Sequence, residues 1–283
     1  MYSQTGHDPK QPGVAPPALS PQLAEAVLGY LGVARDTPDL ALLNALIAAY
    51  VRRVPWESAS RIAKRARTAS AAEAARWPNE FWQDAIRLGT GGTCFESNLA
   101  FFALLRSLGY HGYLTINNMH ETIGCHTALV IQSQDQRWLV DAGYPIHAAL
   151  PLNATPVSQQ DTPLGTYILS AQAPGHYVVQ QTPLPKPYLF DLIDVPVDET
   201  AYCAATINDY TETGLFLDRL VIRKLIDGQI WRFNSDEQPY HLQTFVDGER
   251  IDDPISGDVP AALSAHFGID PGVLAAAFDR LSR

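Results

Sequence analysis

The stretch Gly-Gly-Thr-Cys-Phe-Glu-Ser-Asn at residues 91–98 combines a turn, a helix start and a cysteine, and it determines how the N-terminal part of the chain is interpreted. The two glycines permit a tight approach to a helix. Thr93 is placed to cap that helix, and Glu96, three residues later, to close a capping box. Cys94 is then predicted to be the first helical residue. At that position the free backbone amides and the positive end of the helix dipole favour the thiolate, the reactive form of cysteine.

A reactive thiol also requires a base, and the sequence offers one on a predicted hairpin. His126 opens an apolar strand, Asp141 closes the next one, and a turn at residues 133–134 would set the two side chains directly opposite each other. The carboxylate would orient the imidazole, whose other nitrogen then faces the thiol. Each residue also has an ordinary structural interpretation. Cys94 can be an inert core residue, His126 a satisfied strand-edge histidine and Asp141 a turn starter.

The hydrophobic pattern predicts helices, then strands, then helices again, which is typical of an α+β protein. Helices are predicted at residues 21–28, 39–52, 78–86 and 94–108, and again over 260–281, where a break at 270–272 separates two helical segments. Strands are predicted at 113–116, 126–131, 137–140, 177–179, 188–193, 216–226 and 229–233. Asp227-Gly228 and Asp247-Gly248 are typical hairpin turns. The turn-rich residues 151–163 indicate either a domain hinge or a loop, and the basic residues 61–76 indicate a solvated face.

Composition and charge exclude several classes of partner. A net charge of −10 provides no general basic surface for nucleic acid or a membrane, although a local basic pocket is compatible with it. Cys94, Cys125 and Cys203 form an odd set without metal-site spacing, so we expect reduced thiols in the cytoplasm and no metal. Residues 1–19 are rich in Pro, Gln and Gly and lack an apolar signal core, which predicts a disordered tail.

Two further groups of residues allow other interpretations. Cys125 lies beside His126 and is an alternative nucleophile, or a metal ligand together with His120 and His147. Neighbouring strand residues point to opposite faces, however, which disfavours a shared site for Cys125 and His126. The tryptophans could line an aromatic pocket or fill the core, and the core is the commoner role; they are Trp56, Trp82 and Trp138.

Residues 91–98, His126 and the stretch Leu-Val-Asp-Ala-Gly-Tyr at 139–144 resemble the arylamine N-acetyltransferase family. Pro55-Trp56-Glu57 is similar to an upstream Pro-Phe-Glu element of that family, and the resemblance extends more weakly to residues 216–217 and 266–269. The resemblance implies a Cys-His-Asp triad of the kind shared with transglutaminase-like and papain-like enzymes. By position in the motifs, its members are Cys94, His126 and Asp141.

The same resemblance refines the α+β prediction into regions. After the tail at 1–19, it implies a helical domain with the nucleophile at 20–110. A β-barrel domain with the His and Asp follows at 111–193, and a C-terminal α/β region at 194–283.

The resemblance also implies a chemistry. The Cys94 thiolate would take an acyl group from acetyl-CoA or another acyl-CoA and pass it to an amine, hydrazine or hydroxylamine in a ping-pong reaction. Backbone amides near Cys94 would hold the oxyanion. Acyl-CoA would be a co-substrate, with no permanently bound cofactor. Tyr144, Thr122 and Phe95 are the expected substrate contacts, Thr122 on the donor side. The oligomeric state stays open.

Three departures from the family pattern bear on the substrates. Thr90 stands where the family usually has Arg, which removes a charged interaction from the cysteine loop. Pro145-Ile146 stands where the family usually continues with Gly, in a segment that lines the acceptor pocket. Only residues 211–214 match the family's CoA-contacting stretch, and Glu212 would repel a pyrophosphate. The alternatives are therefore a transglutaminase-like amide synthase, a cysteine hydrolase with the same triad, or a noncatalytic binding domain.

Overall fold

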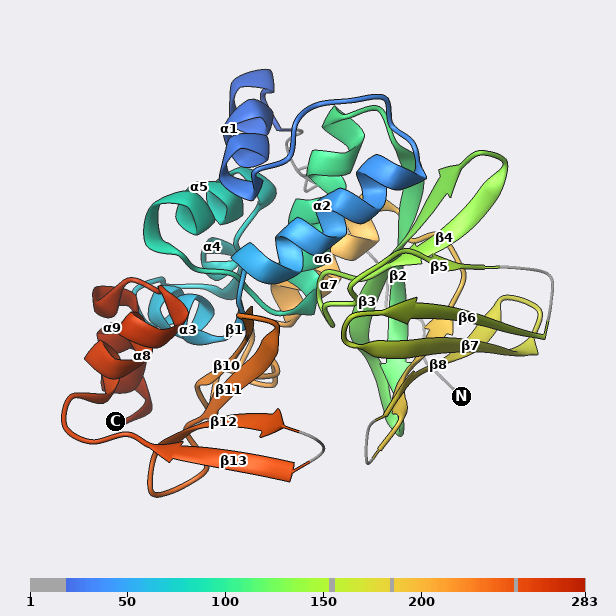
Figure 1. The fold of residues 1–283 in the computed structure, drawn as a ribbon. Coiled ribbons are helices and arrows are strands. Elements are labelled where there is room, and N and C mark those ends of the chain that lie inside the picture. Colours follow the sequence, from blue (N-terminus) through green and yellow to red (C-terminus); the bar gives the residue numbers. More distant parts are fainter. Residues whose placement is uncertain (1–18, 153–155, 184–185, 247–248, 283) are drawn as a thin grey trace, which may run out of the picture.

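The computed structural model describes residues 19–152, 156–183, 186–246 and 249–282 (Figure 1). The predicted tail at 1–19 lies outside the described residues except for Leu19, which is buried against the first core. The predicted turn at Asp247-Gly248 also lies outside them. Within the described ranges, no helix has both the length and the apolar composition needed to cross a membrane.

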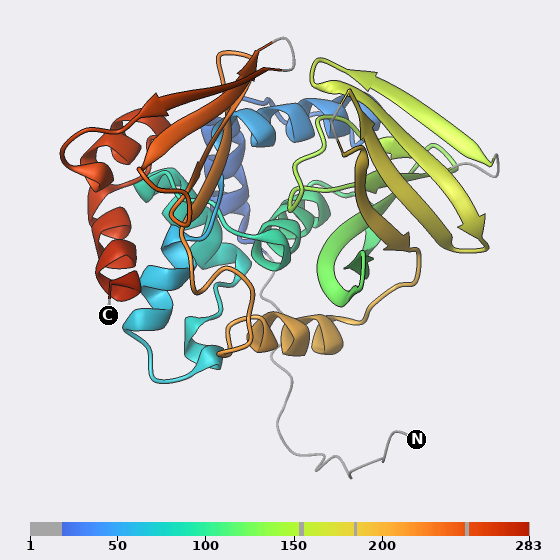
Figure 2. The same ribbon diagram turned by 90° about the horizontal axis from the view of Figure 1, so that it is seen from below.

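Six helices form most of the N-terminal part of the chain, and the helices predicted there are confirmed within a few residues. They are α1 (Pro21–Leu31), α2 (Leu40–Arg53), α3 (Ala59–Ala66), α4 (Ala71–Ala74), α5 (Pro78–Leu88) and α6 (Cys94–Ser107). Ser20 and Asp39 cap α1 and α2 with their side chains. Helix α6 is buried over most of its length, and Figure 2 shows it near the centre of the molecule.

The middle of the chain forms a nearly closed antiparallel barrel of eight strands. They are β2 (His111–Met119), β3 (Thr122–Ser133), β4 (Gln136–Val140), β5 (Leu150–Pro151), β6 (Val157–Thr162), β7 (Gly165–Ala173), β8 (His176–Thr182) and β9 (Tyr188–Ile193). Their order in the sheet is β5-β4-β3-β2-β9-β8-β7-β6. The two end strands meet where the Ser158 hydroxyl donates to the Pro151 carbonyl at 2.8 Å. Residues 157–162 are thus a strand, although the sequence indicated a hinge or a loop.

The C-terminal part builds a second sheet that includes a short strand from the N-terminal region. Its strands are β1 (Trp56–Glu57), β10 (Val221–Ile226), β11 (Gln229–Asn234), β12 (His241–Val246) and β13 (Glu249–Pro254), in that order across the sheet. Helices α8 (Val259–Phe267) and α9 (Pro271–Leu281) follow, and α9 packs on α3. The sequence did not predict α7 (Glu199–Asn208), which Asp198 caps. The α+β prediction is confirmed.

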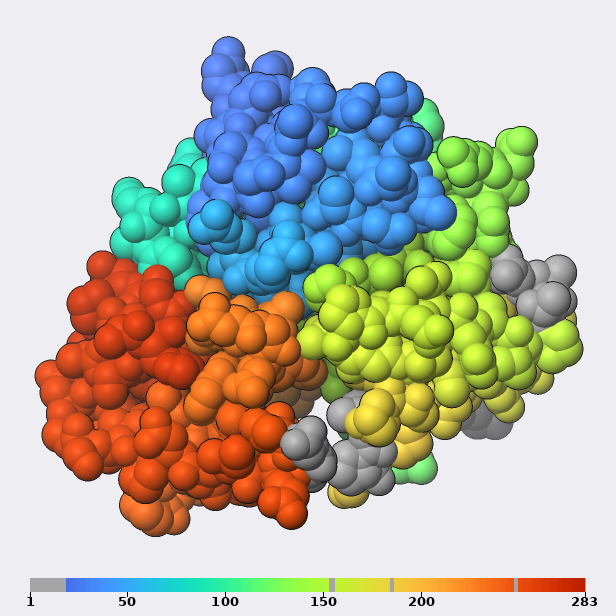
Figure 3. All heavy atoms as spheres, in the orientation of Figure 1, coloured from blue at the N-terminus to red at the C-terminus, as the bar shows by residue number. Residues whose placement is uncertain are grey.

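Helix α2 connects the two sheets. It packs on β10, and its Asn44 accepts a hydrogen bond from the Ala149 amide, next to β5, at 2.9 Å. In the space-filling view the surface is hollowed between the orange C-terminal sheet and the yellow-green barrel (Figure 3). Helix α6, which starts at Cys94, begins where the two sheets and the helical region come together (Figure 2).

The β3–β4 hairpin has a different register from the predicted one. Its turn residues are Gln134 and Asp135, with φ angles of 53° and 58°, and Ser133 pairs with Gln136. The predicted turn at 133–134 is therefore wrong, and Asp141 does not lie directly opposite His126. The register differs by two residues, which keeps every side chain on its predicted face.

Replacing Gln134-Asp135 by Asn-Gly should stabilise the protein. Both positions have the left-handed backbone that Asn and Gly adopt most readily in a two-residue hairpin, so we expect a gain of about 1 kcal/mol in the free energy of unfolding. Urea titration measures it. The same dipeptide occurs at Gln160-Asp161 inside β6, where the identical replacement should destabilise the protein. Equal effects at the two places would contradict the observed turn.

Candidate active site

Cys94 is the first residue of α6, as predicted, but the capping box is wrong. The N-cap Thr93 has an extended backbone, and its side chain makes no capping hydrogen bond. Its hydroxyl instead accepts from Arg61 Nη1. Glu96 is buried and turned away from the N-cap, toward two arginines. Cys94 is partly exposed, and its Sγ lies 3.6 Å from the carbonyl oxygen of Cys125.

A buried group of charged side chains supports the segment before Cys94. Arg61 and Arg76 are 0% and 1% exposed, so the prediction that residues 61–76 form a solvated face is wrong for both. Arg61 pairs with Asp209 at 2.7 Å, and Arg76 Nε lies 3.4 Å from Glu96 Oε2. Arg76 Nη2 also donates to the Gly91 carbonyl. Arg61 donates to the Asp209 carboxylate and carbonyl, whereas Arg76 donates to a backbone carbonyl and has the charge of Glu96 nearby, so neither guanidinium is buried without a countercharge.

Glu57 holds the same segment from the other side. Its fully buried carboxylate accepts from the Gly91 amide at 3.0 Å and from the Ser60 amide at 2.9 Å. The Gly92 carbonyl in turn accepts from the Glu57 amide and from the Ser97 hydroxyl. The two glycines before Cys94 are thus fixed by polar contacts on both sides.

His126 and Asp141 form a buried pair. His126 Nε2 lies 2.6 Å from Asp141 Oδ2, and the His126 ring packs 4.5 Å from the ring of Phe190. The second oxygen, Oδ1, accepts from the Gly143 and Tyr144 amides at 2.8 Å each. The backbone after β4 therefore fixes the carboxylate, leaving one oxygen for the imidazole and the His126 Nδ1 atom for another proton partner.

Asn98, one helical turn after Cys94, joins these parts. Its Nδ2 donates to Asp141 Oδ1 at 3.1 Å and to the Thr127 carbonyl at 2.6 Å, while its Oδ1 accepts from the Ala142 amide at 2.9 Å. The sequence pattern did not predict a role for Asn98, the last residue of the stretch 91–98. Its place one turn after Cys94 on the predicted helix was the available signal.

Two other positioning residues escaped prediction. The Thr127 hydroxyl donates to the Cys94 carbonyl at 3.0 Å, so the residue after His126 contacts the residue with the thiol. The Tyr202 hydroxyl, on the unpredicted α7, donates to the Phe95 carbonyl at 3.0 Å. Both are fully buried.

The loop after Asp141 approaches Cys94 closely. A Cβ atom on Gly143 would lie 2.6 Å from both Cys94 Cβ and Asn98 Nδ2, closer than real Cβ contacts. Tyr144, next in the chain, is half-buried, and the Arg223 guanidinium lies 5.1 Å from its ring centre. Only a glycine at 143 thus allows the loop to lie against Cys94.

The remaining predicted residues have varied surroundings. Thr122 is exposed at the start of β3, and its carbonyl contacts Cys125 Sγ at 3.3 Å. Phe95 is buried in the core, 5.7 Å from the Tyr202 ring. Trp82 is a core residue, whereas Trp56 packs edge-on against Phe216. Within the described ranges, no group of three or more His, Cys, Asp or Glu side chains is arranged to hold a metal ion.

The surroundings of Cys94 raise the pKa of its thiol, contrary to the sequence expectation. Enclosure by protein is the largest cause, and the carboxylates of Asp209 and Asp141 add to it, while Arg61 acts in the opposite direction. The start of a helix therefore does not by itself make the thiolate the resting form. A base must remove the proton.

A family model described as N-acetyltransferase matches residues 39–270. Because this match covers most of the sequence, the chain belongs to the arylamine N-acetyltransferase family, and the resemblance found in the sequence is confirmed. A curated relative, the uncharacterised acetyltransferase YvcN of Bacillus subtilis, is 22% identical over 158 residues, which are 49% of this chain and 59% of that protein.

Solved arylamine N-acetyltransferases have the same fold. The Salmonella typhimurium enzyme aligns with a TM-score of 0.74 and 19% identity over 91% of this chain and 98% of its own. The Mycobacterium abscessus enzyme aligns with a TM-score of 0.75 and 20% identity over 92% of this chain and 95% of its own. A Mycobacterium marinum enzyme in complex with CoA aligns with a TM-score of 0.75 and 18% identity over 91% of this chain and 99% of its own.

Gly143→Ala should destabilise the protein by about 1–3 kcal/mol, because the added methyl group would press on Cys94 and Asn98. Alkylation of Cys94 should change in rate as the thiol is displaced. Gly29→Ala on α1 is the matched control, since nothing lies within 4 Å of a Cβ there. It should be neutral or stabilise by up to about 1 kcal/mol. Thermal unfolding that is alike in both variants would contradict the close approach.

His126→Ala should slow the alkylation of Cys94 at pH 7 by about 100-fold, because the thiol loses its base. A raised pKa means that the thiolate appears only at higher pH. The residual rate in this variant should therefore rise through a midpoint above the roughly 8.5 of a free cysteine. Peptide mapping after timed labelling measures it, with exposed His111→Ala as the control. An unchanged rate in His126→Ala would rule out His126 as the base.

Proposed function

We propose that this protein transfers an acyl group, typically acetyl, from a CoA thioester to the nitrogen of an amine, hydrazine or hydroxylamine through a thioester on Cys94. The observation that carries the proposal is the buried His126–Asp141 pair, which Asn98 and Thr127 connect to the start of the Cys94 helix. Family membership supports the acetyl group and the nitrogen acceptor.

In the first half-reaction His126 Nδ1 accepts the Cys94 proton, and the thiolate attacks the carbonyl carbon of the donor. The carbon–sulfur bond to CoA then breaks, and CoA leaves as the thiol after taking the proton from the imidazolium. In the second half-reaction the amine attacks the Cys94 thioester, its proton passes to His126, and the thiol of Cys94 is regenerated. The raised pKa of the Cys94 thiol favours a proton transfer to His126 that accompanies the attack.

Asp141 orients His126 and stabilises its cationic form. Its Oδ1 accepts from two backbone amides and from Asn98, so the carboxylate cannot rotate away from the imidazole without losing several hydrogen bonds. The free amides in the first turn of α6 are the proposed donors to the oxyanion. Because they belong to the same helix as Cys94, their position relative to the thiol is fixed.

The sites for the two substrates are also part of the proposal. For the acceptor, Tyr144 is the best placed of the predicted contacts, since it follows Gly143 against Cys94. For the donor, residues 211–214 border a surface cavity of about 650 Å³ together with Arg65 and Arg219, whose charges can offset Glu212 near a pyrophosphate. The buried Phe95 is not among the proposed contacts.

Thr90 raised the alternatives of an amide synthase or a hydrolase, because it removes a charged interaction from the cysteine loop. Arg61 and Arg76 supply charged contacts to that loop from another part of the chain. The absence of an arginine at 90 therefore does not argue against acetyl transfer.

Intact-mass analysis after incubation with acetyl-CoA tests the proposal. The wild type should gain one acetyl group and lose it on addition of an arylamine. Cys94→Ser should gain none, whereas the control Cys125→Ser should behave like the wild type. Acetylation of Cys94→Ser would rule out the mechanism. Acyl-enzyme formed from amide donors but not from acyl-CoA would instead identify the amide synthase or hydrolase.

A further inference from the structure

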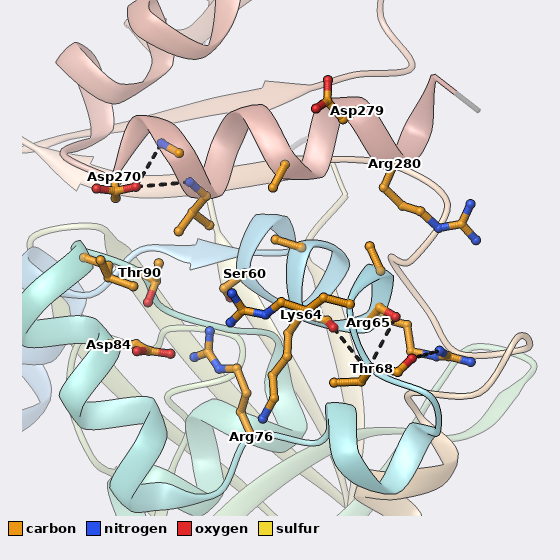
Figure 4. Close-up of a pocket in the computed structure, with 17 residues that line it drawn as sticks. Ser60, Lys64, Arg65, Thr68, Arg76, Asp84, Thr90, Asp270, Asp279 and Arg280 are labelled. Carbon is orange, nitrogen blue, oxygen red and sulfur yellow. Dashed lines mark hydrogen bonds between the residues drawn. The ribbon is translucent and has the colours of Figure 1, made fainter.

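A cavity of about 720 Å³ lies between α3 and α9, with the end of α5 and the residues before the Cys94 loop at its base (Figure 4). Neither Cys94 nor the His126–Asp141 pair lines it. The proposed acyl transfer therefore leaves this cavity without a role.

Two buried polar atoms at the base of the cavity lack hydrogen-bond partners. Arg76 and Thr90 are each 1% exposed, and Arg76 Nη1 and Thr90 Oγ1 have no partner among the described residues. Figure 4 shows both side chains directed into the space that the cavity residues surround. Arg76 Nε and Glu96 Oε2 also lack hydrogen bonds, but they face each other at 3.4 Å as an ion pair. Arg76 Nη1 and the Thr90 hydroxyl have no such partner, and because buried donors are rarely left unpaired they indicate an acceptor that enters the cavity.

The charge of the lining favours an anion. Five basic and three acidic side chains line the cavity, in a chain whose net charge is −10. Arg65, Arg67 and Arg280 form no ion pair with any described carboxylate. Of the acidic residues, Asp84 pairs with Arg87 at 3.2 Å and also lies beside Arg76 (Figure 4), and Asp270 accepts from the first amides of α9. Lys64 pairs with Glu80 at 2.6 Å, so the unpaired positive charge of the lining is that of Arg65, Arg67 and Arg280.

We propose that this cavity binds a small oxyanion, a phosphate or sulfate group, held by Arg76 Nη1 and the Thr90 hydroxyl with Arg67 near its rim. Guanidinium groups match the oxygens of such ligands and bind them with charge-assisted hydrogen bonds. The proposal does not depend on the reaction at Cys94.

The site is connected to the nucleophile loop through Arg76. The same guanidinium donates to the Gly91 carbonyl and faces Glu96, both within three residues of Cys94. An oxyanion bound to the Arg76 guanidinium would weaken the electrostatic attraction between Arg76 and Glu96. Occupancy should therefore alter the reactivity of the Cys94 thiol.

Binding of inorganic phosphate, followed by calorimetry or phosphorus NMR at constant ionic strength, tests the site. The wild type should show saturable binding that chloride does not reproduce. Thr90→Val keeps the shape of the side chain and removes the hydroxyl, so affinity should fall by about tenfold. Arg67→Ala at the exposed rim should weaken binding, whereas exposed Arg35→Ala outside the cavity should not. If the wild type and the three variants bind phosphate with equal affinity, the phosphate is an adventitious ion only and the proposal is overturned.

Two further measurements identify the source of the anion and its effect. Competition by CoA would assign the site to a phosphate of the donor, and phosphate binding alongside CoA would assign it to a free oxyanion; both outcomes support the site. Phosphate should change the alkylation rate of Cys94 in the wild type but much less in Thr90→Val. A response of equal size in the two proteins would contradict the link to this cavity.

Discussion

The side-chain amide of Asn98 is the interaction on which the site depends. It donates to a carboxylate oxygen of Asp141 and to the backbone of β3, and it accepts from the loop after β4. Helix α6 is thus joined to two other segments, β3 and the residues just after β4, through one fully buried side chain, and loss of any of these hydrogen bonds would leave a buried polar group unpaired. The position of this amide therefore links the helix of Cys94 to the carboxylate that contacts His126.

A cluster of four buried charged side chains supports the segment that precedes Cys94. Glu57, Arg61, Arg76 and Glu96 are buried beneath the glycines that precede Cys94. Buried charges of this kind contribute little net stability compared with apolar packing, but they penalise any arrangement in which a partner is lost. These side chains fix the backbone of Gly91 and Gly92, which have no side chains of their own to hold them in place.

Local patterns were sufficient to predict the helices that flank Cys94, the strands of His126 and Asp141, and the α+β class. The hairpin register could not be predicted, because Gln134 and Asp135 lack the composition of their left-handed turn. Strand β6, Val-Ser-Gln-Gln-Asp-Thr, has no apolar alternation, since it closes a barrel edge. The burial of Arg61 depends on Asp209, far along the chain, and only the tertiary fold brings the two together.

The two-residue strand β1 can pair with β10 only late in the synthesis of the protein. Glu57 supports the cysteine loop, and it lies in a strand that pairs with β10, whose residues are 221–226. During synthesis on the ribosome, the segment with Cys94 emerges long before the strand that completes its support. Chains truncated before residue 221 retain the thiol, the imidazole and the carboxylate but lack a pairing partner for β1. The complete support of the Cys94 loop thus forms only when most of the chain has been made, and not with the N-terminal half that contains the loop.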